Sequence, residues 1–231
     1  MTIHIAYVSD VLCVWAYVAE VRLDQLRKEF GDSVELEYRF IPIFGATRYR
    51  ISEGWKERGG YAAFGTHVRK VAEDFPHVKI DARVWTDVAP TTSVTAHEML
   101  CALRLLQEEG AVSADPRDDL GGRSIFEEAI WQVRSAFFEQ ARDISNRSVV
   151  LDVLAQLGLP IAAIEAKLNS GEALAEVFRD VELRDKQNIE GSPTYYLNQG
   201  RQKLYGNVGY RVVSANLREL IEQPGHQASW C

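Results

Sequence analysis

One cysteine stands at a place where its side chain could do chemistry. The stretch DVLCVWAY puts Cys13 directly after an apolar run and directly before a helix-like pattern. A thiol at the first turn of a helix faces free backbone N–H groups and the positive end of the helix dipole, which stabilise a thiolate. We therefore expect Cys13 to be a nucleophile whose pKa lies below that of a free cysteine. The alternative is a packed and inert thiol, because free cysteine is often buried.

No second cysteine follows at the spacing of a dithiol oxidase. Such an enzyme expels its mixed disulfide by attack from a second thiol, but the third residue after Cys13 is Ala16. Glutathione, another protein, or one of the two remaining cysteines would have to resolve the mixed disulfide. Cys101 lies in a strongly helical stretch and is expected in the core, whereas Cys231 is the last residue of the sequence.

The segment around Cys13 reads as strand, helix and strand. Residues 3–9 are β-branched and aromatic, as in a buried strand. A helix is predicted from about Val14 until Gly31 ends it, and residues 33–43 form a second strand. A right-handed crossover of this length implies that the two strands are parallel.

The rest of the chain divides into a helical part and a second strand-containing part. Helical periods occupy five stretches, at residues 93–110, 123–141, 148–160, 161–171 and 171–188. Strand character returns at 192–207 as a hairpin that turns at 198–200, and an amphipathic helix follows at 210–223. We predict an α/β chain with one discontinuous domain, residues 1–45 and 176–231, interrupted by an all-helical insert, residues 46–175.

This order of elements resembles the DsbA-like branch of the thioredoxin fold. The resemblance is carried by DVLCVWAY and by IEGSPTYYLNQGRQKLYGNVGYRVVSANLREL, and it covers essentially the whole chain. The group contains DsbA oxidoreductases, kappa-class glutathione transferases and 2-hydroxychromene-2-carboxylate isomerases. It implies a thioredoxin-like fold with an inserted all-helical domain. DsbA oxidoreductases carry Cys-x-x-Cys, from which Ala16 departs. The other two groups carry Ser-Pro-aromatic-Ser, from which Cys13 and Val14 depart.

The resemblance also implies further site residues. It places a cis peptide bond at Ser192-Pro193 beside Cys13, where the Ser192 backbone can pair with an extended peptide or with glutathione. In kappa-type enzymes the γ-glutamyl end of glutathione is held just after the last strand, which points to Asn207. Trp15 is expected to pack beside the thiol or to shape the mouth of the substrate site.

Composition narrows the choice of partners. Of 231 residues, 46% are hydrophobic and 26% charged, as in a soluble globular protein. The net charge of −7 argues against nucleic-acid binding, and no apolar run reaches the roughly 18 residues that span a bilayer. The N-terminus lacks the order of a signal peptide, so we expect a cytoplasmic location. We expect no metal site, because the spacing of His97, Glu98 and Cys101 fits none.

Three functions remain open. The first is a DsbA-like thiol-disulfide oxidoreductase that uses Cys13 alone, with glutathione as co-substrate and no tightly bound cofactor. The second is a glutathione-dependent transferase or isomerase, and the third is a catalytically inactive binding module. The expected partner is glutathione, a small thiol or disulfide, or a peptide, bound where the two domains meet. Dimers are common in the enzymes the chain resembles, so a homodimer is one assembly to test.

Overall fold

Strand β1 (Ile3–Ser9) forms the interior of the sheet because both of its faces are apolar. Ile3, Ile5 and Tyr7 pack into the larger core cluster, and Ala6 and Val8 pack into a second cluster on the opposite face. Six of the seven side chains of this strand are buried. A strand of this kind needs a covering layer on each face. The structure is a computed structural model that describes residues 2–225 and 229.

The sheet has the order β2-β1-β3-β4. β2 (Val34–Phe40) pairs with β1 in parallel. β3 (Thr194–Leu197) pairs with β1 in antiparallel fashion and is joined through a tight turn to β4 (Gln202–Tyr205). The parallel pair and the C-terminal hairpin predicted from the sequence are therefore both present.

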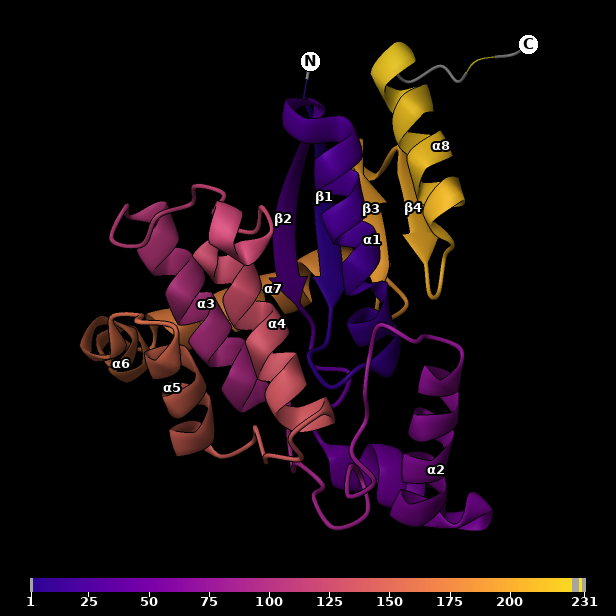
Figure 1. Ribbon diagram of the computed structural model, residues 1–231, viewed down its shortest axis with the longest axis vertical. Coiled ribbons are helices and arrows are strands. Elements are labelled where there is room, and N and C mark those ends of the chain that lie inside the picture. Colours follow the sequence, from indigo (N-terminus) through magenta and orange to yellow (C-terminus); the bar gives the residue numbers. More distant parts are fainter. Residues whose placement is uncertain (1, 226–228, 230–231) are drawn as a thin grey trace.

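Helices cover the two faces of the sheet. α1 (Val14–Phe30) and α8 (Tyr210–Glu222) lie side by side on one face, and α7 (Glu172–Lys186) runs behind the other (Figure 1). Glu29 of α1 joins the first two helices, since it accepts hydrogen bonds from the Ser214 hydroxyl (3.0 Å) and the Arg218 guanidinium (2.6 Å). The result is a thioredoxin-like α/β layer arrangement.

The remaining helices form the insert between β2 and β3. α3, α4, α5 and α6 gather beside β2, whereas α2 lies apart from them, below the end of the sheet where β1 stops (Figure 1). Their bounds are α2 Gly60–Glu73, α3 Val94–Glu108, α4 Ile125–Phe138, α5 Arg147–Gln156 and α6 Ile161–Ser170. Short 3₁₀ turns occur at Gly31–Ser33, Lys56–Arg58, Asp118–Leu120 and Asn198–Gly200, and a π-helical turn at Arg48–Glu53.

A buried ion pair fastens the insert to the sheet layer. Arg134 of α4 is fully buried and pairs with Glu20 of α1, and it also donates to the Ser9 hydroxyl at 2.9 Å. Breaking one half of such a pair would leave the other charge uncompensated in the core. The two parts of the chain therefore share one interior.

Most predicted elements are found within a few residues of their expected bounds. Gly31 ends α1 with φ 47°, in the region that glycine tolerates best. No specific element was predicted between residues 46 and 90, where the structure has a π-helical turn and α2. The expected boundary between residues 175 and 176 falls inside α7. Within the described residues, no helix is long and apolar enough to cross a membrane.

Candidate active site

Cys13 lies where β1 gives way to α1. It is the N-cap residue of the helix, with φ −82° and ψ 114°, and its carbonyl accepts the N–H groups of Ala16 (3.1 Å) and Tyr17 (3.0 Å). Its side chain, 7% exposed, belongs to the first helical turn, which contains no acidic residue. The structure thus places the thiol at the helix N-terminus, as the sequence predicts.

The Ser192-Pro193 loop meets this thiol from the other end of the chain. The Ser192-Pro193 peptide bond is cis. The thiol of Cys13 donates a hydrogen bond to the Ser192 carbonyl at 3.3 Å, and the Ser192 hydroxyl accepts the Asp10 N–H at 2.9 Å. Three predicted site residues, Cys13, Ser192 and Pro193, therefore form one cluster.

The acidity of the thiol differs from the sequence-based expectation. Burial raises the pKa of Cys13 above its ordinary value, and the negative charge of Asp10 acts in the same direction. A hydrogen bond from the Ser192 side chain and the N–H groups of Ala16 and Trp15 act to lower the pKa, but they do not prevail. The expectation of a lowered pKa was therefore wrong. The position at the helix terminus was predicted correctly, but burial of the sulfur has the larger effect on its pKa.

Asp10 organises the turn that presents Cys13. Its carboxylate is fully buried, with Oδ1 accepting the Leu12 N–H and Oδ2 accepting the Phe44 N–H, each at 2.8 Å. The Ser93 hydroxyl donates to Oδ2, also at 2.8 Å. Burial acts to raise the pKa of Asp10, but His97 and the two N–H groups hold it below its ordinary value. A fixed negative charge therefore lies next to the nucleophile.

Two residues at the start of α3 complete this cluster. The His97 ring is fully buried, its Nε2 accepts the Val11 N–H at 3.1 Å, and it lies 3.6 Å from Oδ1 of Asp10. Ser93 occupies the N-cap position of α3, yet its side chain does not cap the helix and turns to Asp10. The sequence offered no signal for either contact, because both depend on how the insert packs against the turn before α1.

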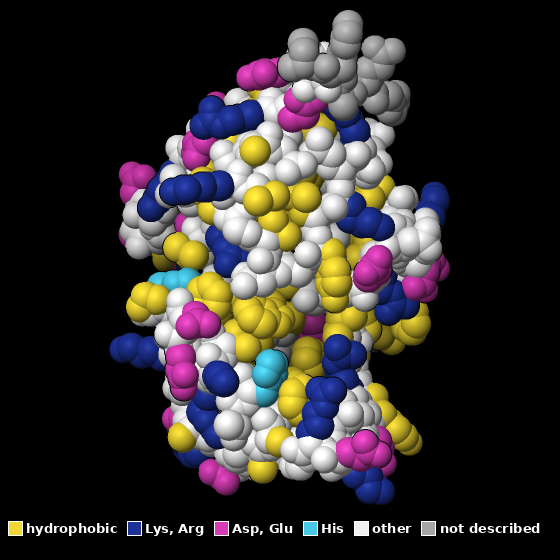
Figure 2. Space-filling view, turned by 90° about the vertical axis from the view of Figure 1, so that its right-hand side faces the viewer, with side chains coloured by type: hydrophobic (Ala, Val, Ile, Leu, Met, Phe, Trp, Pro, Cys, Tyr) yellow, Lys and Arg dark blue, Asp and Glu magenta, His cyan; other side chains and the backbone are white. Residues whose placement is uncertain are grey.

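Trp15 of α1 and Asn207, which follows β4, are linked through Phe75 and Arg22. Trp15 is partly buried and meets Phe75 edge to face, with ring centroids 6.4 Å apart. Arg22 lies over the same Phe75 ring and donates to Oδ1 of Asn207 at 2.6 Å. Figure 2 shows hydrophobic side chains gathered across the narrow waist between the surface around α2 and the surface above it. Arg22 is a site candidate that the sequence did not suggest.

Comparison with known proteins agrees with this geometry. The family model of the DSBA-like thioredoxin domain matches residues 4–218. The chain belongs to this family. A search of curated proteins finds no match.

Several solved structures have the same fold at low sequence identity. A candidate protein disulfide isomerase of Nitrosomonas europaea has a TM-score of 0.75 at 13% identity, covering 97% of this chain and 100% of that one. The cytosolic disulfide reductase DsbM of Pseudomonas aeruginosa has a TM-score of 0.62 at 21% identity, covering 93% and 98%. A 2-hydroxychromene-2-carboxylate isomerase has a TM-score of 0.63 at 15% identity, covering 96% and 97%. Both chemistries are thus found on this fold.

Cys101 is a poor resolving thiol in this DSBA-like domain. It is fully buried in α3, where the Arg104 guanidinium lies 3.7 Å from its sulfur, and burial raises its pKa to about 12. A thiol that stays protonated in the core cannot readily attack a disulfide. Ala16 is also fully buried, and Cys231 lies outside the described residues.

Aromatic residues of the insert pack into the same hydrophobic core as the sheet layer. Trp85 is fully buried and meets Phe64, Tyr61 and Phe44 at centroid distances of 5.4, 6.3 and 5.7 Å. The described residues contain no group of three or more His, Cys, Asp or Glu side chains placed to hold a metal ion.

Proposed function

We propose that this protein is a thiol-disulfide oxidoreductase with Cys13 as its only nucleophile and glutathione as the resolving thiol. The observation that supports this most directly is the contact between the Cys13 sulfur and the Ser192 carbonyl, at 3.3 Å beside the cis-proline. When Cys13 forms a mixed disulfide it no longer has a proton to donate, so the Ser192 carbonyl loses this hydrogen bond and becomes free. That carbonyl could then accept an N–H of glutathione or an extended peptide.

The proposed chemistry proceeds in two exchanges. The Cys13 thiolate attacks the glutathione sulfur of a protein–glutathione mixed disulfide, the old S–S bond breaks, and the protein leaves as a thiolate that takes up a proton. Glutathione thiolate then attacks the Cys13–glutathione disulfide, which releases oxidised glutathione and regenerates Cys13. Two electrons pass from glutathione to the substrate disulfide. Neither step needs a second protein cysteine, so Ala16 is no obstacle.

Asn207 is suited to hold one end of glutathione. Its side chain is exposed, and Arg22 donates to Oδ1 at 2.6 Å. The amide nitrogen then points away from Arg22, where it can donate to a carboxylate. Arg22 follows Cys13 by nine residues, a rise of about 13 Å along a helix, and helical side chains point back toward the N-terminus. A bound tripeptide spanning roughly 10 Å would bridge most of that interval.

Two of the structural neighbours support the choice of partner and compartment. DsbM of Pseudomonas aeruginosa is described as a cytosolic disulfide reductase, and one of its structures contains glutathione. We extend both properties to this chain as part of the proposal, with cytoplasm as the working location.

The direct test is incubation with oxidised glutathione followed by intact-mass measurement. We expect one glutathionyl adduct on the wild type and on a Cys101→Ser variant, and none at this position in a Cys13→Ser variant. Peptide mapping should place the adduct on Cys13. Reduced glutathione should then remove it with release of oxidised glutathione. Absence of an adduct on folded wild-type protein, even at alkaline pH, would refute the proposal.

The raised pKa of Cys13 favours a second candidate function. A thiol that remains protonated can donate a hydrogen bond, as it does to Ser192, and could donate one to the sulfur of bound glutathione. This role fits a glutathione-dependent transferase or isomerase. Turnover of an electrophile panel with reduced glutathione, retained in the Cys13→Ser variant, would select it over the redox reaction. Failure of both assays in folded protein would leave a binding module.

A further inference from the structure

The outer edge of β2 is open over half of its length. β2 is the terminal strand of the sheet, so alternate N–H and C=O groups point away from β1. The outward groups at its C-terminal half are occupied, because the Tyr38 carbonyl accepts Arg104 at 2.8 Å and the Phe40 N–H donates to Asp180 at 2.8 Å. The same alternation turns the N–H and C=O of Leu36 outward, where none of the described residues binds them.

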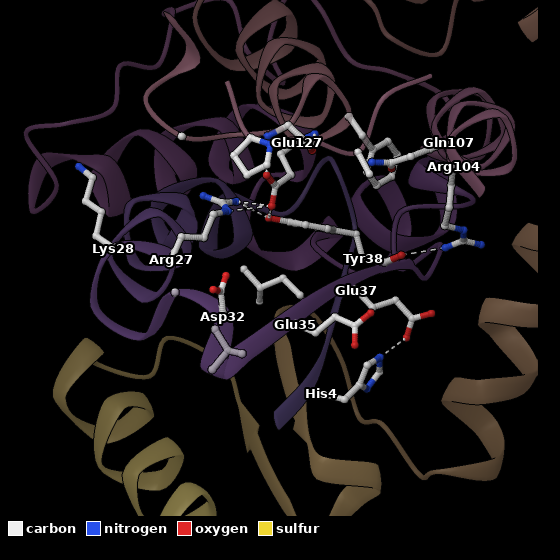
Figure 3. A pocket seen from close by; sticks show the side chains of 18 of the residues that line it. His4, Arg27, Lys28, Asp32, Glu35, Glu37, Tyr38, Arg104, Gln107 and Glu127 are labelled. Atoms are coloured by element: carbon white, nitrogen blue, oxygen red, sulfur yellow. Dashed lines mark hydrogen bonds and ion pairs between the residues drawn. The ribbon is translucent and has the colours of Figure 1, made fainter. Parts of the chain in front are cut away.

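A groove runs along this open half. It has a volume of about 760 Å³, with β2 as one wall and the insert as the other. Val34, Leu36 and Tyr38 form the strand side, and Gln107 of α3 and Phe126 of α4 belong to the facing side. Figure 3 shows the strand running through the middle of the view, with Lys28 and Asp32 toward one end and Arg104 toward the other. The groove lies along the start of β2, away from Cys13 at the opposite end of β1.

Some charged residues of the groove are already neutralised. Arg27 binds both the Tyr38 hydroxyl (2.8 Å) and Glu127 (2.7 Å), and these three side chains point toward one another (Figure 3). Glu37 pairs with His4 at 3.0 Å.

The charged residues that remain available are mainly acidic. Three acidic lining residues are exposed and form no ion pair within the described part of the chain: Asp32, Glu35 and Glu108. Among the described lining residues, Lys28 is the one cation that is likewise exposed and without an ion pair. A ligand in this groove therefore meets a net negative charge. It also meets partly buried apolar side chains, Val34 and Leu36.

We propose that this groove binds an extended peptide segment with basic side chains, which adds a strand to β2. The free groups of Leu36 would supply main-chain hydrogen bonds, and Glu35 and Glu108 would attract the basic side chains. Val34 to Tyr38 spans five residues, or roughly 17 Å, so the segment is about five residues long. Binding here requires neither Cys13 nor glutathione, and the proposal stands apart from the redox function.

The probe is a fluorescein-labelled, capped Lys-Val-Lys-Val-Lys peptide, followed by fluorescence anisotropy. We expect saturable binding that weakens with salt, and at least tenfold weaker binding of Glu-Val-Glu-Val-Glu. In an added strand only alternate amides face the edge. Backbone N-methylation of one alternate set should therefore reduce affinity at least tenfold, and methylation of the other set should change it much less. Equal effects of the two sets would overturn the strand-addition model.

Matched charge reversals test the location. The Glu35→Lys/Glu108→Lys variant should bind the basic peptide at least tenfold more weakly. Glu182→Lys/Glu222→Lys has the same net charge change on exposed residues outside the groove lining, and it should retain wild-type affinity. Leu36→Pro removes the outward N–H of this edge strand together with the leucine side chain of the groove wall, and it should also weaken binding. Equal affinity of the two charge variants would overturn the proposal.

The oligomeric state provides an independent check. Light scattering of the wild type and the Glu35→Lys/Glu108→Lys variant would reveal a second copy of the chain in the groove. A dimer that the groove variant disrupts, together with no peptide binding, would replace the peptide with a homodimer contact. Peptide binding that persists in Cys13→Ala supports a separate site, whereas its loss there would overturn the assignment.

Discussion

Replacing Asp10 with asparagine should separate two effects of this buried carboxylate, one on the fold and one on the thiol. Asparagine keeps one oxygen, so it can still accept from Phe44 and Ser93 if that oxygen takes the Oδ2 position. The amide nitrogen then faces the Leu12 N–H, which loses its acceptor. A hydrogen bond to a charged group contributes about 1.5–3 kcal/mol, and a neutral one about 1 kcal/mol.

The magnitude follows from these three contacts. Loss of the Leu12 bond costs about 2 kcal/mol and weakening of the other two costs about 1 kcal/mol each, or about 4 kcal/mol together. For a chain of this size that lowers the melting temperature by about 10 °C. Asp118 is the matched control, because it is exposed and its side chain forms no ion pair with any residue that the structure describes; Asp118→Asn should change stability by less than about 0.5 kcal/mol.

The pH dependence supplies the decisive measurement. Because the folded pKa of Asp10 is lowered, its stabilisation is fully present above the ordinary value of 3.8 and is lost as pH falls through the folded value. Urea unfolding should therefore show a gap between wild type and Asp10→Asn at pH 7 that narrows at acid pH. Removing the charge should also lower the pKa of Cys13, measured by iodoacetamide alkylation across pH. A gap that does not narrow, or a thiol pKa that rises, would refute the assigned role of Asp10.

Three further outcomes are expected. Wild-type Cys13 should be alkylated more slowly at pH 7 than free glutathione, because its pKa is raised. The alkylation rate should rise about tenfold per pH unit until the pH passes the raised pKa of Cys13. A rate that reaches a plateau below pH 8 would contradict this. Arg134→Met should cost about 3–5 kcal/mol in urea unfolding, because it leaves Glu20 buried without its partner. The double variant Glu20→Leu/Arg134→Met should be more stable than that single variant. Although burial acts to raise the pKa of Asp24, its ion pair with Arg123 (2.6 Å) holds that pKa below the ordinary value. The stabilisation is therefore fully present above pH 3.8 and is lost as the pH falls through the lowered value. Asp24→Asn should accordingly be less stable than wild type at pH 7, and chemical denaturation should show this gap narrowing as the pH is lowered further into the acid range.

Local sequence signals were sufficient for most of the fold. Gly31 can adopt the positive φ that ends α1, and the alternation of apolar residues and the turn at 198–200 define the hairpin. These signals depend only on residues that are close together in the sequence, so they can be recognised without the three-dimensional structure. Residues 46–90 lack such signals. Trp85 in this segment packs against Phe44 and Phe137, each of which is more than 40 residues away from it in the chain.

The site was predictable in outline and not in its electrostatics. The junction at Cys13 and the Ser192-Pro193 pair could be recognised from motifs, and the structure brings them together. Asp10, Ser93 and His97 could not be combined in advance, since the last two approach from α3, more than 80 residues away in the chain. The raised pKa of Cys13 comes first from burial of the thiol and also from the nearby Asp10 charge, and the helix-terminus argument included neither.

The bond between Ser93 and Asp10 has a consequence for anyone wishing to simplify this protein. In the intact protein the Asp10 carboxylate has four polar neighbours. A shortened chain made only of the sheet and its flanking helices would lose two of them, the Ser93 and His97 side chains. The turn that carries Cys13 would then be held by an Asp10 carboxylate that keeps only half of its polar partners. The insert is thus needed to hold the turn before α1. Moving Cys13 and this turn into another protein would require moving the start of α3 as well.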